Sequence, residues 1–203
     1  MVRGINYSVR QMFPLTDGAG YKLFGANIYP HPPWWGFLLR RNMNIQSGFF
    51  YHIKDAFFEE VQDNSLMANK EDGNYRPHYL AIQDSQNPGI YWMVPVSSKF
   101  EKYQNIYSRQ VARYKKCTKI VLGKCGGWDA AFLIQNAFPT TADYFDHIHT
   151  SKGVPLSLHD STAKLIAENL SYNIRLHKRG IPLFYTDIDR IYHLMEEKLK
   201  AGN

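Results

Sequence analysis

Two adjacent serines followed by a lysine, Ser97, Ser98 and Lys99, combine residue types and spacing that could do chemistry. They come directly after Ile90–Val96, an apolar run rich in β-branched and aromatic residues, which predicts a strand. Hydroxyls and an ammonium group at a strand end can bind a phosphate, particularly where a helix begins and its N–H groups point outward. The simpler interpretation is that a serine only caps this helix and that Lys99 is solvated.

His78 is a further candidate, because histidine is the usual proton carrier near neutral pH. It immediately precedes Tyr79–Ile82, a second predicted strand, and the turn-forming residues 84–89 separate this strand from the first. We therefore predict an antiparallel hairpin, which brings the outer ends of both strands together and places His78 near the serines. The alternative is a structural histidine. His147 and His149 alternate as on one face of a strand, but the sequence offers them no partner.

These residue types suit the cleavage of RNA without a metal ion. In that reaction the ribose 2′-hydroxyl attacks the adjacent phosphate, so the protein needs only to move protons and to stabilise the negative charge of the phosphorane. A histidine would move the protons, and basic side chains with backbone N–H groups would hold the charge. Paired-carboxylate, phosphate-loop and metal-ligand motifs do not occur at specific spacing, so we expect neither a metal nor another cofactor.

The segment from residue 97 to 124 carries eight lysine or arginine residues and only one acidic residue, Glu101, in a chain of net charge +6. Three tyrosines are interleaved with these cations. Such a segment suits a polyanion whose bases stack on aromatic rings, although a solvated helix face is the competing interpretation. The basic residues are Lys99, Lys102, Arg109, Arg113, Lys115, Lys116, Lys119 and Lys124.

The remaining pattern predicts an α+β fold. Pro95 cannot donate to a ladder, so its strand should lie at a sheet edge or end there. Four or five short strands imply a small barrel or a strongly curved antiparallel sheet, with the sheet ending near Phe138. Strands are expected at 48–53, 119–123 and 130–134, the last two joined by the turn Gly126–Asp129, and helices at 55–61 and 101–116 and in two C-terminal segments around 166–174 and 186–199.

Residues 1–42 differ from the rest, because they are rich in glycine, proline and aromatic residues and show no sustained period. We predict an N-terminal extension there, disordered or the product of a start assigned upstream of Met43, and one domain over 43–203; an ordered arm is the alternative. The apolar runs are too short to cross a bilayer, and a secretory signal pattern is missing. Cys117 and Cys125 make no disulfide framework, so a cytoplasmic location is expected.

Four parts of the domain carry a resemblance to a known family: Phe50–Lys54, Asn69–Lys70 with Tyr75–His78, Tyr91–Lys99 and Ala131–Pro139. Together they resemble the ToxN/AbiQ toxins of type III toxin–antitoxin systems, most closely the CptN-like branch. The resemblance implies a compact barrel with surrounding helices that acts as a metal-independent, sequence-preferring endoribonuclease. Such toxins process a repetitive small RNA, whose folded repeats inhibit them in closed protein–RNA assemblies.

The resemblance also implies site residues. A functional hydroxyl of the family corresponds to Ser98, and a functional lysine corresponds to His78, which departs from it but can still act as acid or base. We expect cleavage of the antitoxin precursor and of cellular or phage transcripts, leaving 2′,3′-cyclic phosphate ends and serving phage defence by abortive infection. RNA is the expected partner, not DNA or a membrane. The catalytic residues would be His78, Ser98, Ser97 and Lys99, with Lys70, Tyr75, Arg76, Lys102, Arg109 and Arg113 holding RNA.

Two other functions stay open on the sequence. A non-catalytic RNA-binding protein could use the same basic segment, and a protein–protein interaction module would be favoured if the basic face made no contact with RNA.

Overall fold

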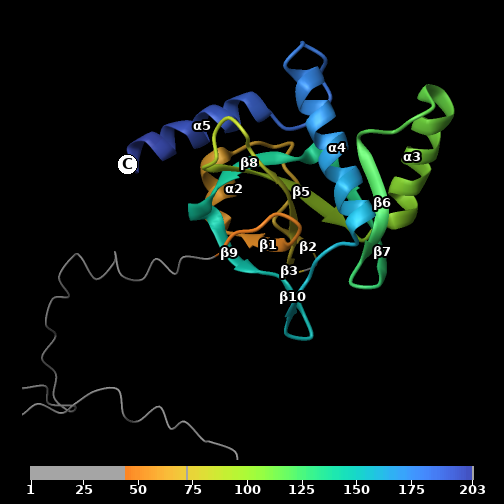
Figure 1. Cartoon of the computed structure of the whole chain (residues 1–203), viewed down its shortest axis with the longest axis horizontal. Helices are drawn as coiled ribbons and strands as arrows, with labels where there is room; N and C mark the ends of the chain where they lie inside the picture. Colours follow the sequence, from red (N-terminus) through yellow and green to blue (C-terminus); the bar gives the residue numbers. More distant parts are fainter. Residues whose placement is uncertain (1–43, 72, 203) are drawn as a thin grey trace, which may run out of the picture. The chain divides into compact units, whose positions relative to one another are not determined.

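The computed structural model describes residues 44–71 and 73–202 (Figure 1). The N-terminal extension predicted over residues 1–42 lies outside the described residues. In the described part, a seven-stranded antiparallel sheet has the order β6-β7-β5-β4-β1-β9, and β8 also pairs with β5. Its strands are β1 (Phe50–Ile53), β4 (His78–Gln83), β5 (Ile90–Ser97), β6 (Ile120–Cys125), β7 (Trp128–Leu133), β8 (Phe138–Thr141) and β9 (Phe145–Ile148).

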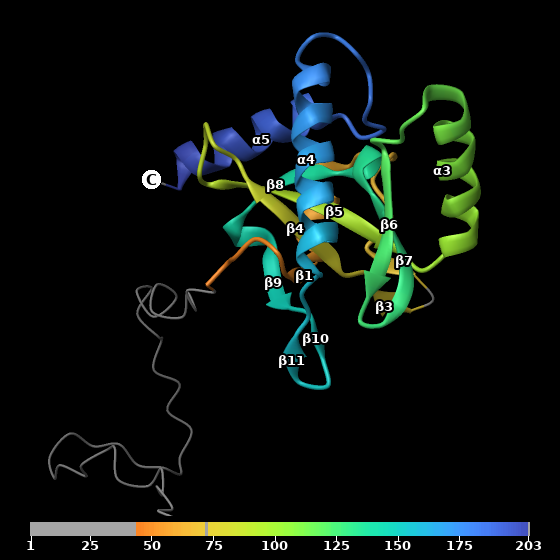
Figure 2. The ribbon, with the colours of Figure 1, turned by 45° about the vertical axis from the view of Figure 1, so that its right-hand side comes forward.

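Helices and two short hairpins surround this sheet. Figures 1 and 2 show α3 beside β6 and β7, α4 across the sheet and α5 along β8. The helices are α2 (Asp55–Val61), α3 (Phe100–Tyr114), α4 (Asp160–His177) and α5 (Ile188–Ala201). The hairpins pair β2 (Lys70–Glu71) with β3 (Asn74–Tyr75), and β10 (Thr150–Ser151) with β11 (Val154–Pro155); single 3₁₀ turns occupy Ile134–Asn136 and Ala142–Tyr144. None of the helices described is long and apolar enough to cross a membrane.

Strand β5 is central, not an edge strand. Its first edge pairs with β4, including His78 opposite Pro95. Its second edge pairs with β8 from Ile90 to Met93 and with β7 at Val96 and Ser97. Pro95 lies between these two ladders, where a missing N–H costs no sheet hydrogen bond. The prediction that Pro95 marks an edge strand or a strand end was therefore wrong.

The α+β class, the antiparallel sheet and the two C-terminal helices are confirmed. The hydrogen-bonded path ends at β6 and β9, so the sheet of the described residues is open and not the closed or strongly curled barrel that was expected. The sheet also does not end near Phe138, because β8 continues it. Pro139 is tolerated in β8 because this strand pairs with β5 alone, and a proline N can face the unpaired side of an edge strand.

The two faces of the sheet bury two different apolar clusters. Because successive side chains of a strand point to opposite faces, Phe50 and Tyr79 join one cluster and Tyr51 and Leu80 join the other. Helix α4 covers the first cluster, whereas α2 and α5 cover the second. The covering side chains are Ile166 and Leu170 from α4, Phe57 and Val61 from α2, and Ile191 and Met195 from α5.

Strand β7 allows a direct test of this arrangement. Phe132 is fully buried, with its ring centroid 6.3 Å from that of Phe50 and 6.1 Å from that of Tyr79. We expect Phe132→Ala to lower the free energy of unfolding by about 3–5 kcal/mol, since it removes a large buried side chain and leaves a cavity. Urea unfolding measures this loss.

The matched control lies on the same strand. Trp128 is 81% exposed, so Trp128→Ala should change the free energy of unfolding by no more than about 0.5 kcal/mol. Similar losses for both substitutions would contradict the assignment of Phe132 to the core and of Trp128 to the surface.

Candidate functional site

The two serines at the end of β5 have opposite environments. Ser97 is 1% exposed, and its Oγ accepts a hydrogen bond from the backbone N–H of Lys99 at 3.2 Å. Ser98 and Lys99 are exposed, and α3 begins at Phe100. This hydrogen bond lies in the turn before α3. The N-cap of α3 is Lys99 and no side chain caps the helix, so the interpretation of a serine as its cap was wrong. Ser97 holds the turn, and Ser98 carries the hydroxyl that solvent can reach.

Ser98 and Lys99 border an open cleft of about 670 Å³ between the start of α3 and the tip of the β6–β7 hairpin. Lys102 adds a second cation from the first turn of α3. Two acidic residues also border this cleft: Glu101 lies in the first turn of α3, and Asp129 is paired with Lys124 Nζ at 3.0 Å. A phosphate at this cleft would meet the Ser98 hydroxyl, two ammonium groups and the positive end of a helix dipole, with the Glu101 carboxylate directed to solvent or to a neighbouring cation.

Arg76 ties the start of β4 to the end of β5. Its Nη1 donates to the carbonyl of Val96 at 2.8 Å, and its Nε donates to the carbonyl of Ala68 at 3.1 Å. The side chain is 7% exposed. The predicted hairpin is thus confirmed, because it brings Arg76 to the residue before Ser97. In this structure the Arg76 guanidinium binds two backbone carbonyls, one of them directly before the two serines. The sequence predicted that this side chain binds RNA.

The hairpin also brings His78 close to the serines, but its ring faces away from the cleft. His78 shares a sheet face with Leu80, and its ring lies 6.0 Å from that of Phe58 and 5.4 Å from that of Phe138. It is fully buried, and neither ring nitrogen has a hydrogen-bond partner among the described residues. Burial, with a further contribution from Arg76, lowers the pKa of His78 to about 3. A catalytic role for His78 stays a prediction.

Lys70 and Tyr75 lie together on the β2–β3 hairpin and share one carboxylate. Lys70 Nζ and the Tyr75 hydroxyl both bond Asp55 Oδ2, at 3.1 Å and 2.9 Å, and the ammonium lies 4.3 Å from the centre of the Tyr75 ring. Hydrogen bonds from Asn69, Lys70 and Tyr75 lower the pKa of Asp55. Both predicted RNA-binding side chains are exposed, at the end of the sheet where β4 begins.

Lys102, Arg109 and Arg113 form a basic stripe along α3. Their spacing of seven and four residues places them on one face of the helix, and all three are exposed. Half-buried side chains such as Ile106 and Tyr107 pack the other face against β6 and β7. The stripe begins with Lys102 at the cleft and continues along the exposed face of α3, an arrangement that agrees with both interpretations of the basic segment, polyanion binding and a solvated helix face.

Sequence reasoning missed a histidine cluster on β1 and β9. His52 Nε2 lies 2.9 Å from His149 Nδ1, and the rings of His52 and His147 stack with centroids 4.4 Å apart. Burial lowers the pKa of His52 to about 4, and His147 and His149 contribute. The alternation of His147 and His149 was a visible signal. Their partner was not, because it lies almost a hundred residues earlier in the sequence.

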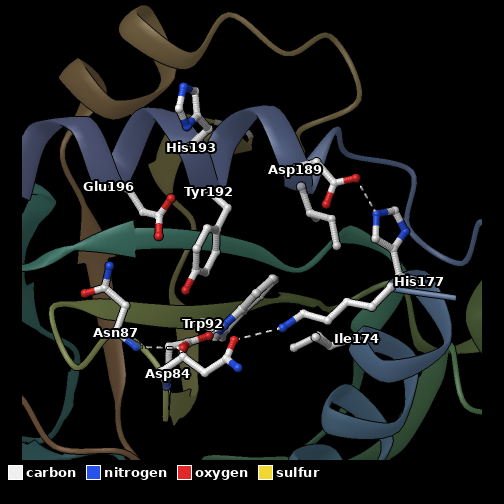
Figure 3. Close-up of a pocket in the computed structure, with 12 residues that line it drawn as sticks. Asp84, Asn87, Trp92, Ile174, His177, Asp189, Tyr192, His193 and Glu196 are labelled. Carbon is white, nitrogen blue, oxygen red and sulfur yellow. Dashed lines mark hydrogen bonds and ion pairs between the residues drawn. The ribbon is translucent and has the colours of Figure 1, made fainter. Parts of the chain in front are cut away.

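A second pocket, of about 310 Å³, lies near the start of β5, at the opposite end of this strand from the serines. Figure 3 shows Asp84, Trp92 and Tyr192 turned toward one another in it. Asp84 accepts hydrogen bonds from Trp92 Nε1 at 3.1 Å and from the N–H of Asn87 at 3.0 Å. His177 Nε2 lies 2.8 Å from Asp189 Oδ2. Asp84, Trp92 and His177 Nε2 thus have partners in the pocket, whereas His177 Nδ1 has none among the described residues. None of the residues that line this pocket lines the cleft at Ser98.

No family model matches the sequence, and no curated protein matches it. Several solved structures match its fold, and two of them are as follows. AbiQ, a lactococcal anti-phage endoribonuclease of a type III toxin–antitoxin system, has a TM-score of 0.53 at 10% identity, over 76% of this chain and 99% of AbiQ. A protein from a bacterial antiviral system that a processed non-coding RNA regulates has a TM-score of 0.52 at 13% identity, over 75% of this chain and 97% of that one.

These matches confirm the predicted resemblance as a likeness of fold over about three quarters of the chain. The CptN-like branch stays a prediction.

The buried state of His78 predicts how stability depends on pH. The folded chain disfavours protonation of His78, whose pKa falls from 6.5 to about 3. The stabilisation of the folded chain that neutral His78 provides is therefore complete above pH 6.5 and is lost as the pH falls toward 3. We expect His78 alone to lower the free energy of unfolding by about 2 kcal/mol between pH 7 and pH 5. Urea unfolding at a series of pH values measures this.

His78→Leu is the informative variant, because leucine keeps much of the volume and cannot be protonated. The stability of this variant should depend less steeply on pH than that of the wild type, with His52 supplying a remaining dependence of the same sign. Equal slopes for both proteins would show that His78 is not buried in its neutral form.

Proposed function

We propose that this protein is the toxin of a type III toxin–antitoxin system and acts as a metal-independent endoribonuclease. The exposed hydroxyl of Ser98 carries the proposal, because it lies at a helix start in an open cleft with Lys99 and Lys102. The likeness of fold to AbiQ, an anti-phage endoribonuclease, agrees with it. Since one fold can serve many functions, the cleft and not the likeness supports the chemistry.

In the proposed reaction the ribose 2′-oxygen forms a bond to the adjacent phosphorus, and the bond to the 5′-oxygen of the next nucleotide breaks. The products are a 2′,3′-cyclic phosphate and a 5′-hydroxyl. The proton of the 2′-hydroxyl passes to a base, and the leaving oxygen takes up a proton from an acid. Ser98 would donate a hydrogen bond to a phosphate oxygen, and Lys99 would stabilise the charge that develops there.

The other predicted residues divide into two groups. Ser97 and Arg76 hold the backbone at the end of β5 and so keep Ser98 in place. Lys102, Arg109 and Arg113 would bind the phosphates of the RNA along α3, and Lys70 with Tyr75 would bind it at the β2–β3 hairpin.

His78 requires a conformational change if it is to act as an acid or a base. Its side chain is fully buried between Phe58 and Phe138, so the ring must leave these contacts before it can meet a substrate. Once the His78 imidazole is exposed to solvent, burial no longer lowers its pKa, which would then lie closer to its ordinary value.

The proposed partner is RNA in two forms. One is the repeat-derived antitoxin RNA, which the toxin would cut from its precursor and which would then inhibit it in a closed protein–RNA assembly. The other is cellular or phage transcripts. The second fold neighbour comes from an antiviral system that a processed non-coding RNA regulates, which agrees with the first form.

A non-catalytic RNA-binding protein is the alternative, since the basic stripe on α3 would serve it equally well. Both functions predict an RNA affinity that falls with added salt, so binding does not separate them. Cleavage does.

The first test is incubation of the purified full chain with a mixed RNA in EDTA, followed by mapping of the product ends. We expect discrete cuts with 2′,3′-cyclic phosphate ends. Ser98→Ala should lower the cleavage rate by about 10²-fold or more, because it removes a donor to the charged phosphate, and should leave RNA affinity nearly unchanged. Ser108→Ala is the matched control, since it changes an exposed serine further along α3.

His78→Leu belongs in the same experiment. If His78→Leu binds RNA but no longer cuts it, the result would support proton transfer by His78. If the variant is fully active, His78 does not transfer the proton. A wild-type protein that binds RNA but never cuts it, with or without added metal, would overturn the nuclease in favour of the RNA-binding protein.

A further inference from the structure

Trp128 is a large aromatic side chain held in an unusually open position. It is 81% exposed, although tryptophan is buried on average in folded proteins. It begins β7 directly after Gly126 and Gly127, whose φ angles of +59° and +93° lie in the region that glycine occupies without strain. Trp128 pairs with Cys125 across this two-residue turn. The indole is therefore fixed at a hairpin tip of the tight type that suits twisted strands.

The backbone pairing of β6 with β7 continues to the hairpin tip, where Trp128 pairs with Cys125. Lys124 and Asp129 lie opposite each other in the β6–β7 ladder, and their side chains form an ion pair at 3.0 Å. Further along, β7 pairs with β5 at Ala131 and Ser97. The position of Trp128 relative to the end of β5 is thus set by one continuous ladder.

The same ladder places the indole beside the proposed reaction centre. Trp128 lies three residues from Ala131, the partner of Ser97, which corresponds to about 10 Å along the strand. Trp128 borders the cleft that Ser98, Lys99 and Lys102 also border. A phosphate at Ser98 and a base of the same strand at Trp128 would therefore lie close together in one open cleft.

The indole differs from other exposed aromatic rings of this protein. Tyr75 lies 4.3 Å from Lys70 Nζ, and Tyr114 lies 5.1 Å from the guanidinium carbon of Arg113. Among the described residues, Trp128 has no such ring or cation contact. An uncovered indole in a cleft with two ammonium groups is the combination that binds unpaired nucleic acid, because bases stack on the ring while cations attract the backbone.

We infer that Trp128 is a stacking platform for one unpaired nucleobase next to the scissile phosphate, and that the cleft takes a single-stranded RNA segment. The inference rests on the proposed function. It adds a residue that would favour single-stranded RNA over duplex RNA. A base within a duplex is covered by its neighbours, so pairing would remove the stacking contact. The hydrogen bonds of Ser98 and the lysines to phosphate would not distinguish the two forms of RNA.

The test uses the full chain and a short single-stranded RNA that contains a mapped cleavage site, with a 2′-deoxy sugar at that site so that binding is measured without cutting. We expect Trp128→Ala to weaken binding by about 5- to 150-fold and Trp128→Phe to weaken it less, because phenylalanine still stacks. Tyr185→Ala, which removes a 59% exposed aromatic ring that does not border the cleft, should bind like the wild type.

A series of RNAs with one abasic nucleotide each, on either side of the cleavage site, locates the base. At one position the wild type and Trp128→Ala should bind equally, since the stacked base is already missing. A duplex across the site should also bind both proteins equally. Equal binding of both proteins to the intact single strand, or a difference that persists at every abasic position, would overturn the inference.

Different results would contradict the stacking role of Trp128 and the proposed nuclease activity. If the wild type cuts RNA and Trp128→Ala cuts and binds it equally well, stacking is wrong and the nuclease stands. If the wild type binds an unstructured single-stranded RNA without cutting it and Trp128→Ala binds that RNA more weakly, the stacking of an unpaired base stands without a scissile phosphate beside it, and the nuclease is wrong.

Discussion

The division of one edge of β5 between two partners is the constraint on which this structure depends. Along that edge the strand pairs first with β8 and then with β7, and the change falls at Pro95, which has no N–H to leave unpaired. The opposite edge pairs with β4 from Tyr91 to Pro95. Because β5 joins both halves of the sheet, its end at Ser97 is surrounded by β4, by β7 and by the start of α3. The cleft at Ser98 lies there, between the start of α3 and the tip of the β6–β7 hairpin.

The two-residue period of the strands decides which polar groups can reach a substrate. His78 falls on the face that buries Leu80 and Phe138, so its imidazole is enclosed and neutral. Ser97 is buried as well, whereas Ser98 follows the last residue of the strand and is exposed. A shift of one residue in either strand would exchange these environments. The register of β4 on β5 is therefore as important to the site as the identity of its residues.

Charge and aromatic surface are arranged around the same point. Lys99 and Lys102 lie at the cleft, Arg109 and Arg113 continue the positive face along α3, and Trp128 stands on the other rim. Phosphate groups and unpaired bases require different partners, and the cleft offers both within a short distance. The likeness to two solved structures is a statement about fold, so these side chains, and not the topology, support the assignment of function.

The sequence by itself determined the local elements and which residue types follow one another at the end of β5. Apolar alternation, turn residues and helix periods predicted α2 at its observed bounds, the β4–β5 and β6–β7 hairpins, both C-terminal helices and the Ser-Ser-Lys junction, because these patterns act between near neighbours. Only the tertiary structure decided that Pro95 is central, that His78 faces the core, that His52 meets His149, and that Trp128 borders the cleft of Ser98. Each of these depends on which distant strands pair and in which register, and that choice is set by the packing of the whole sheet.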